Sequence, residues 1–105
     1  MEKRLCKRRI RRLNITFSDG KSEYKGISSD FSCNGLFIRT RKGYTVGTVL
    51  AMRLEMQNGR KVPLTGIVKR TVKTDLSSYK NGMGVHLTAV PEEYDNFIKE
   101  LYSGY

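Results

Sequence analysis

Residues 49–57 read Val-Leu-Ala-Met-Arg-Leu-Glu-Met-Gln (VLAMRLEMQ), the clearest alternation of apolar and polar side chains in the sequence. The apolar residues occupy every second position from Leu50 to Met56, so on an extended backbone they share one face. Asn58-Gly59 follows directly, and this pair is typical of tight hairpin turns because glycine adopts positive φ without steric cost. The stretch therefore predicts a strand with one buried face that runs into a hairpin.

The same period of two recurs on both sides of this strand. We expect further strands at residues 13–17, through Tyr24 and Ile27, and at residues 35–40, 62–72 and 83–87. Tight turns are predicted at Asp19-Gly20 and Asn81-Gly82, and Pro63 favours an edge or strand-entry position. Short strands with short connections predict an all-β fold, a small antiparallel barrel of about six strands, because closure removes exposed sheet edges.

The C-terminal part of the sequence changes to a helical period. Tyr94, Phe97, Ile98 and Leu101 fall at i, i+3, i+4 and i+7, which gives one apolar face. Pro91 suits the first position of a helix. We expect an amphipathic helix over 91–102 that packs on the barrel, within a single domain of residues 13–105 that follows an N-terminal arm of residues 1–12.

Positive charge is concentrated in that arm. The 105 residues carry a formal net charge of +10, and the first twelve hold seven Lys or Arg and one acid. Residues 7–12 read KRRIRR. A charge density of this kind attracts anions persistently, so the pattern predicts an anionic partner without naming it.

Several kinds of chemistry have no support in the sequence. There is one histidine, His86, and there is neither a P-loop nor a GxGxxG motif, so we expect no catalytic site, no metal site and no cofactor. The two cysteines, Cys6 and Cys33, form no CxxC pair, which favours reduced thiols in a cytoplasmic protein. No run approaches the ~20 apolar residues of a membrane span, so no membrane insertion is expected.

A second polar segment, Ser28 to Gly35 (SSDFSCNG), lies between the second and third expected strands. Asp30 and Ser32 are two residues apart, so on an extended backbone their carboxylate and hydroxyl point the same way. Gly35 allows the chain to bend or a ligand to approach the backbone. The alternative is a turn in which Asp30 and Ser32 only satisfy nearby backbone groups.

Two motifs in this order resemble the PilZ domain family, small barrels that bind the bacterial second messenger cyclic di-GMP. They are RxxxR, present as Arg8 to Arg12 directly before the first strand, and DxSxxG, present as Asp30 to Gly35. Gly82 to Leu87 (GMGVHL) resembles the late-strand G-x-G-V-x-F pattern of the family. Three residues differ from what is usual in the family: Leu87 replaces the common Phe, His86 stands where arginine is frequent, and Phe31 stands where DxSxxG usually has an aliphatic residue. Arg4 and Arg8 also satisfy RxxxR, but in the family the second arginine lies at the start of the first strand, which selects Arg12. The resemblance covers essentially the whole chain.

The resemblance implies a cyclic di-GMP site built from the arm and the DxSxxG segment. Its expected residues are Arg8, Arg9, Arg12, Asp30, Ser32, Gly35 and Gly84. It also implies a standalone receptor that is a monomer or a weak dimer. Binding of the ligand is expected to order the arm, and the ordered arm is expected to signal to a downstream protein partner.

Two other functions are consistent with parts of the pattern. One is a basic barrel that binds single-stranded nucleic acid, which would tolerate Lys in place of Arg, lose affinity steeply with salt and have no use for Asp30. The other is a PilZ-like interaction module without ligand binding. The complete set of motif residues favours the receptor, and a nucleic acid partner is not expected.

Overall fold

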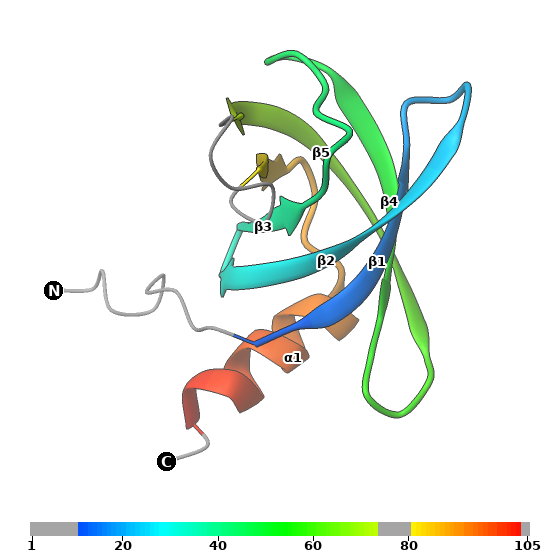
Figure 1. Ribbon diagram of the computed structural model, residues 1–105. Helices are drawn as coiled ribbons and strands as arrows, with labels where there is room; N and C mark the ends of the chain where they lie inside the picture. Colours follow the sequence, from blue (N-terminus) through cyan, green and yellow to red (C-terminus); the bar gives the residue numbers. More distant parts are fainter. Residues whose placement is uncertain (1–10, 74–80, 104–105) are drawn as a thin grey trace, which may run out of the picture.

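The computed structural model describes residues 11–73 and 81–103 (Figure 1). In chain order, these residues form β1 (Leu13–Ser18), β2 (Glu23–Ser32), β3 (Gly35–Arg39), β4 (Val49–Glu55), β5 (Lys61–Val72), β6 (Gly82–Leu87) and α1 (Glu92–Ser103). The strands pair antiparallel in the order β1-β2-β3-β6-β5-β4 and close into a barrel. The predicted all-β barrel with one C-terminal helix is confirmed.

The barrel interior collects the apolar half of each alternating strand. In β4, Leu50, Met52 and Leu54 are buried whereas the residues between them are exposed, as the sequence predicts. Burial of this apolar face is the main favourable term that holds the strands in register, because a shift of one residue would turn the whole set to solvent.

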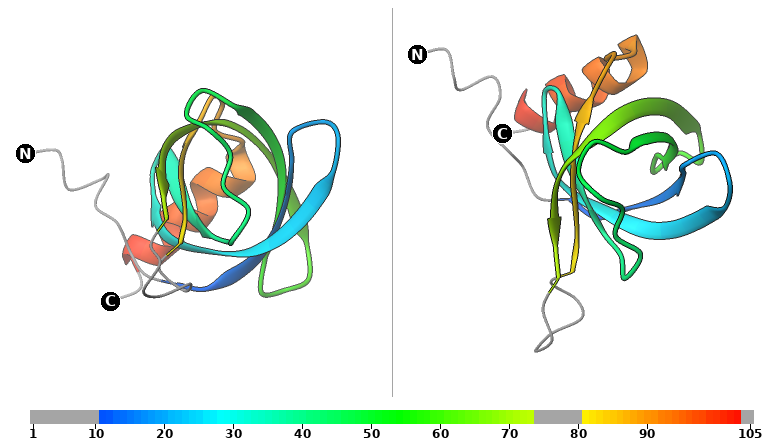
Figure 2. Two further views of the ribbon diagram at one scale, coloured as in Figure 1. Left: turned by 45° about the horizontal axis from the view of Figure 1, so that its top comes forward. Right: turned by 90° about the horizontal axis from the view of Figure 1, so that it is seen from above.

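Helix α1 lies across one end of the barrel, and a view into the barrel shows it behind the ring of strands (Figure 2). Its apolar stripe is the predicted one: Tyr94, Phe97 and Ile98 are buried, and Leu101 packs against the core. The Phe97 ring meets Phe31 of β2 edge to face, with centroids 5.1 Å apart. The helix is therefore part of the core, and it begins and ends one residue later than predicted.

The turns follow the prediction in two of three places. Gly20 and Gly59 have φ of 100° and 89°, as the Asp-Gly and Asn-Gly pairs predict. The tight turn predicted at Asn81-Gly82 is wrong, because Gly82 already belongs to β6 and pairs with Val72 of β5. The segment before it, residues 74–80, lies outside the described residues.

Two further expectations concern β5 and β2. Pro63 does lie near the start of β5, at a strand entry. It pairs with β4 on one side, but on the other side the pairing of β5 with β6 begins only at Gly66. Because β6 does not pair with β5 at Pro63, the missing N–H of proline costs no hydrogen bond to β6. In contrast, β2 continues to Ser32 through most of the segment that was expected to be a connection.

Candidate functional site

Strand β2 carries a β-bulge at Asp30. Its pairing with β3 runs from Ser29 opposite Phe37 to Ser32 opposite Gly35, so Asp30 and Phe31 together face a single residue of β3. Asp30 has a φ of 52°, in the left-handed region that aspartate tolerates better than most residues. Phe31 is turned into the core, with no exposed surface, while Asp30 and Ser32 are half-buried. The prediction that Asp30 and Ser32 lie on one side is correct, and the bulge decides which side: Ser28 and Phe31 are both buried, so the extra residue leaves Asp30 and Ser32 on the outer face.

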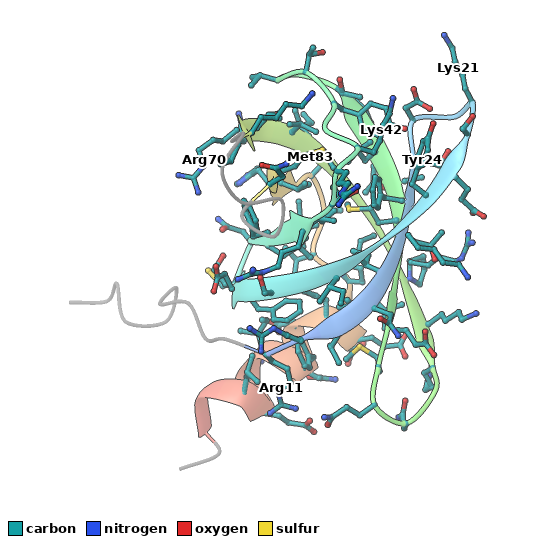
Figure 3. The ribbon with its side chains drawn as sticks, viewed as in Figure 1. Arg11, Lys21, Tyr24, Lys42, Arg70 and Met83 are labelled. Atoms are coloured by element: carbon teal, nitrogen blue, oxygen red, sulfur yellow. The ribbon has the colours of Figure 1, made fainter. Side chains whose placement is uncertain are left out.

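A second bulge lies three strands away, in β5. Val68 pairs with Val85 and Arg70 pairs with Gly84, so Lys69 is an additional residue in β5. The buried residues of β5 up to this point are Val62, Leu64, Gly66 and Val68, a phase that would turn position 70 inward. The extra residue reverses the phase and places Arg70 on the outside of the barrel (Figure 3).

Between the two bulges, the outer face of β2, β3, β6 and β5 contains an open pocket of about 310 Å³. This volume is near the lower limit of the ~300–1,000 Å³ that small-molecule sites usually have. The pocket is lined by Asp30, Ser32, Gly35, Leu36, Phe37, Lys69, Arg70, Gly84, Val85 and His86. Four of the predicted site residues, Asp30, Ser32, Gly35 and Gly84, therefore meet in one place.

The two glycines of this set have different surroundings. A Cβ at Gly35 would lie 2.8 Å from the backbone oxygen of Val85, so only glycine allows β3 and β6 to approach so closely. A Cβ at Gly84 would lie 3.8 Å from the Arg70 Cβ, an ordinary contact. Gly35 is thus required by the packing of the strands, and Gly84 only leaves the pocket floor open.

Hydrogen bonds hold the β2–β3 turn in place. The Ser32 hydroxyl donates to the carbonyl oxygen of Gly35 at 3.3 Å. The Tyr94 hydroxyl of α1 is shared between the carbonyl oxygens of Ser32, at 2.8 Å, and Gly35, at 2.9 Å. For Ser32, the reading in which the side chain satisfies a nearby backbone group is therefore correct in part, although its oxygen retains acceptor capacity.

Asp30 differs from Ser32. Its carboxylate lines the pocket and makes no hydrogen bond or ion pair with any residue in the described ranges. A half-buried carboxylate normally finds a partner because its desolvation is costly. The unpartnered Asp30 therefore offers a strong acceptor to a molecule that enters the pocket.

The arm residues are described only in part. Arg8 and Arg9 lie outside the described residues. Leu13 pairs with Ser28, so Arg12, which directly precedes Leu13, lies at the same end of the β1–β2 ladder as Asp30. The Arg12 side chain is exposed and does not line the pocket. Its neighbour Arg11 is directed elsewhere, because Nη1 donates to Oε1 of Gln57 at 3.1 Å (Figure 3).

Sequence reasoning missed several of the lining residues. Phe37, Lys69 and Arg70 were not proposed, and neither was His86, which is exposed and lines the pocket. A signal for Arg70 was available. Its position continues the buried phase of β5, and because an unpaired arginine is not stable in an apolar core, a break of phase before it could have been predicted.

The structure also bears on three expectations drawn from the composition, which concern metal sites, membrane-spanning helices and the state of the cysteines. The described residues contain no cluster of three or more His, Cys, Asp or Glu side chains that could hold a metal ion. Within the same ranges, no helix has the length and apolarity needed to cross a membrane. The expectation of reduced thiols is wrong for Cys33, which is disulfide-bonded, and Cys6 lies outside the described residues.

Comparison with solved structures returns barrels of the same kind. The inhibitor of motility MotI/DgrA of Bacillus subtilis superposes with a TM-score of 0.79 at 14% identity, over 99% of this chain and 51% of its own. The chain thus spans about half the length of that protein. The PilZ domain of CeSA from a cellulose-synthesizing bacterium superposes with a TM-score of 0.63 at 16% identity, over 92% of this chain and 95% of its own.

The sequence was also compared with curated proteins and with models of protein families. No curated protein matches the chain. The model of the PilZ domain family matches residues 2–104, nearly the full length. Together with the closed six-stranded barrel, this match shows that the chain belongs to the PilZ domain family, a family of cyclic di-GMP receptors.

Proposed function

We propose that this chain is a cyclic di-GMP receptor that holds its ligand between the N-terminal arm and the pocket on the outer face of the barrel. The ligand residues are Arg8, Arg9 and Arg12 of the arm and Asp30, Ser32, Gly35 and Gly84 of the pocket. The observation that carries the proposal is the Asp30 carboxylate, which lines the pocket and has no partner among residues 11–73 and 81–103.

Asp30 suits guanine in particular. The edge of guanine that carries N1–H and N2–H₂ presents adjacent donors, and a carboxylate accepts from both in a two-pronged arrangement. Adenine has no such pair of donors, and Asp30 would repel a bare phosphate. The pocket is therefore proposed to take a base, with the phosphates placed outside it.

The arginines suit the phosphates. A guanidinium grips a phosphate through two parallel N–H···O bonds, a geometry that lysine does not reproduce. Arg12 is exposed at the end of the β1–β2 ladder next to Asp30, where it is available to a ligand that projects from the pocket. At about 310 Å³ the pocket accommodates only part of a dinucleotide, so the arm is proposed to enclose the remainder.

The signal would then be a change of surface. A ligand that contacts both arm and barrel orders the arm, at a cost of ~1–2 kcal/mol of backbone entropy per residue. Each charge-assisted hydrogen bond contributes about 1.5–3 kcal/mol, so at least two arginines must act together. We infer a cytoplasmic receptor without enzymatic activity whose ordered arm is recognised by a partner protein.

Titration calorimetry with single substitutions tests the assignment. Arg8→Ala, Arg12→Ala and Asp30→Ala should each weaken cyclic di-GMP binding by roughly 10- to 150-fold, the equivalent of one charge-assisted bond. Arg11→Ala is the matched control, because it removes the same charge from a side chain that is bonded to Gln57, and it should bind nearly as the parent does. If Arg8→Ala, Arg12→Ala and Ser32→Ala all bind like the parent, the assignment is wrong.

A further inference from the structure

Strand β6 has two glycines on its outer face. Met83, Val85 and Leu87 point into the core, so Gly82, Gly84 and His86 point outward. Gly84 pairs with Phe37 of β3 on one side and with Arg70 of β5 on the other. The floor of the pocket at Gly84 is therefore bare backbone, with an aromatic ring and an arginine as its cross-strand neighbours.

The two glycines of β6 are covered differently. A Cβ at Gly82 would lie 2.6 and 2.7 Å from ring carbons of Phe37, so that ring already occupies the space above Gly82. Among the described residues, a Cβ at Gly84 would meet Arg70 alone, at 3.8 Å from Cβ and 3.9 Å from Nε. The Arg70 side chain thus passes beside the Gly84 floor, and its guanidinium begins at the pocket.

Arg70 has no competing bond within the described part of the chain. It is exposed, and it makes no hydrogen bond or ion pair with the other residues of the described ranges. Without the extra residue Lys69, the alternation of β5 would turn Arg70 inward; with it, Arg70 points outward. β-Bulges that re-aim one side chain are frequent beside functional sites.

We propose, on the basis of the proposed function, that the Arg70 guanidinium stacks on the face of the guanine whose edge Asp30 binds. Two strands, β3 and β6, separate Asp30 from Arg70. Three strand spacings of ~4.8 Å put their backbones roughly 14 Å apart across the sheet, which leaves room for a flat base between the two side chains. Asp30 selects guanine through its edge, and Arg70 adds affinity through the face of the ring.

Stacking requires the flat guanidinium and not merely a positive charge. An arginine stacks on aromatic rings through its planar, delocalised group, whereas lysine has a compact ammonium. Stacking on a base contributes about 1–3 kcal/mol to the binding free energy, whichever base it is, and this corresponds to roughly 5- to 150-fold in affinity. Arg70→Lys should therefore lose most of what Arg70→Ala loses.

The test is calorimetry with cyclic di-GMP on the full chain, with thermal unfolding of each variant as a check of folding. Arg70→Ala should weaken binding at least about fivefold, Arg70→Lys nearly as much, and neither should lower the melting temperature because the side chain has no bonding partner among the residues that the structure describes. Lys61→Ala removes an exposed charge from the same strand outside the pocket and should leave the affinity unchanged. In ¹⁵N-resolved NMR spectra, the Arg70 Nε–H resonance should shift on titration.

The outcomes separate this inference from the function on which it rests. If the parent and Arg70→Ala bind equally while Arg12→Ala and Asp30→Ala are weakened, the Arg70 stacking is wrong and the receptor assignment stands. If Arg70→Lys binds like the parent, charge alone accounts for the effect and stacking is refuted. If the parent does not bind at all, both proposals fail.

Discussion

Gly84 and Gly35 line the same pocket, yet an added methyl group should have opposite consequences at the two positions. At Gly35 the new Cβ would lie 2.8 Å from the Val85 carbonyl oxygen, which forces β3 away from β6. Gly35→Ala should therefore destabilise the fold by about 1–3 kcal/mol, measured by urea denaturation. At Gly84 the new methyl has room beside Arg70.

Gly84→Ala should accordingly fold as well as the parent or slightly better, because alanine loses less backbone entropy than glycine. The methyl group would project into the pocket, so cyclic di-GMP binding should weaken. A Gly84→Ala protein that binds as tightly as the parent would show that the ligand does not reach the β6 floor. A Gly35→Ala protein of unchanged stability would contradict the close β3–β6 approach.

Single side chains were predicted unevenly from the sequence. Asp30, Ser32, Gly35 and Gly84 were identified from motifs, and the structure brings them to one pocket. Arg70 was not identified, because the alternation of β5 continued past Val68 turns position 70 inward, whereas the extra residue Lys69 turns it outward. Period-two reasoning assumes an uninterrupted strand, and it fails where a bulge changes the phase.

Helix α1 and the β2–β3 turn are joined through one hydroxyl group. Tyr94 is fully buried, and its hydroxyl bonds the Ser32 and Gly35 carbonyl oxygens within the DxSxxG motif. Tyr94→Phe retains the ring and removes this connection, leaving the Ser32 carbonyl without this bond. We expect a loss of about 1–3 kcal/mol in unfolding free energy, and weaker cyclic di-GMP binding because the turn is held less firmly.

Tyr44→Phe is the matched control for that experiment. The Tyr44 hydroxyl is buried and makes no hydrogen bond of normal geometry, and burial together with the nearby Asp19 carboxylate raises the pKa of this phenol above its ordinary value. Removing an unsatisfied buried hydroxyl should leave stability unchanged or increase it. If Tyr94→Phe and Tyr44→Phe have the same effect on unfolding, the Tyr94 bonds do not stabilise the turn.

The helix illustrates what sequence periodicity can and cannot provide. The spacing of Tyr94, Phe97, Ile98 and Leu101 predicted both the helix and the face that it buries. The bond from Tyr94 to the turn could not be predicted, because it joins residues far apart in the sequence and depends on where the barrel places the helix. The tight turn expected at Asn81-Gly82 failed for a related reason. Gly82 lies in a strand, and a glycine is needed there because the ring of Phe37, distant in sequence, occupies the space of a side chain.

For the molecule as a whole, the net charge of +10 suits any anionic partner, so charge does not separate a dinucleotide receptor from a nucleic acid binder. Salt dependence does separate them. Cyclic di-GMP has two phosphates, so raising salt from about 50 to 200 mM should weaken binding by less than about tenfold. A nucleic acid that contacts six or more phosphates would lose about a thousandfold or more.

The most direct measurement is a calorimetric titration of the full chain with cyclic di-GMP at about 50 mM and about 200 mM salt. The receptor assignment predicts saturable binding at both concentrations, with a loss of less than about tenfold between them. It also predicts that Asp30→Ala is weakened at both, because the contact of Asp30 with the base does not depend on general attraction of anions. Absence of saturable binding at either salt concentration would contradict the central claim.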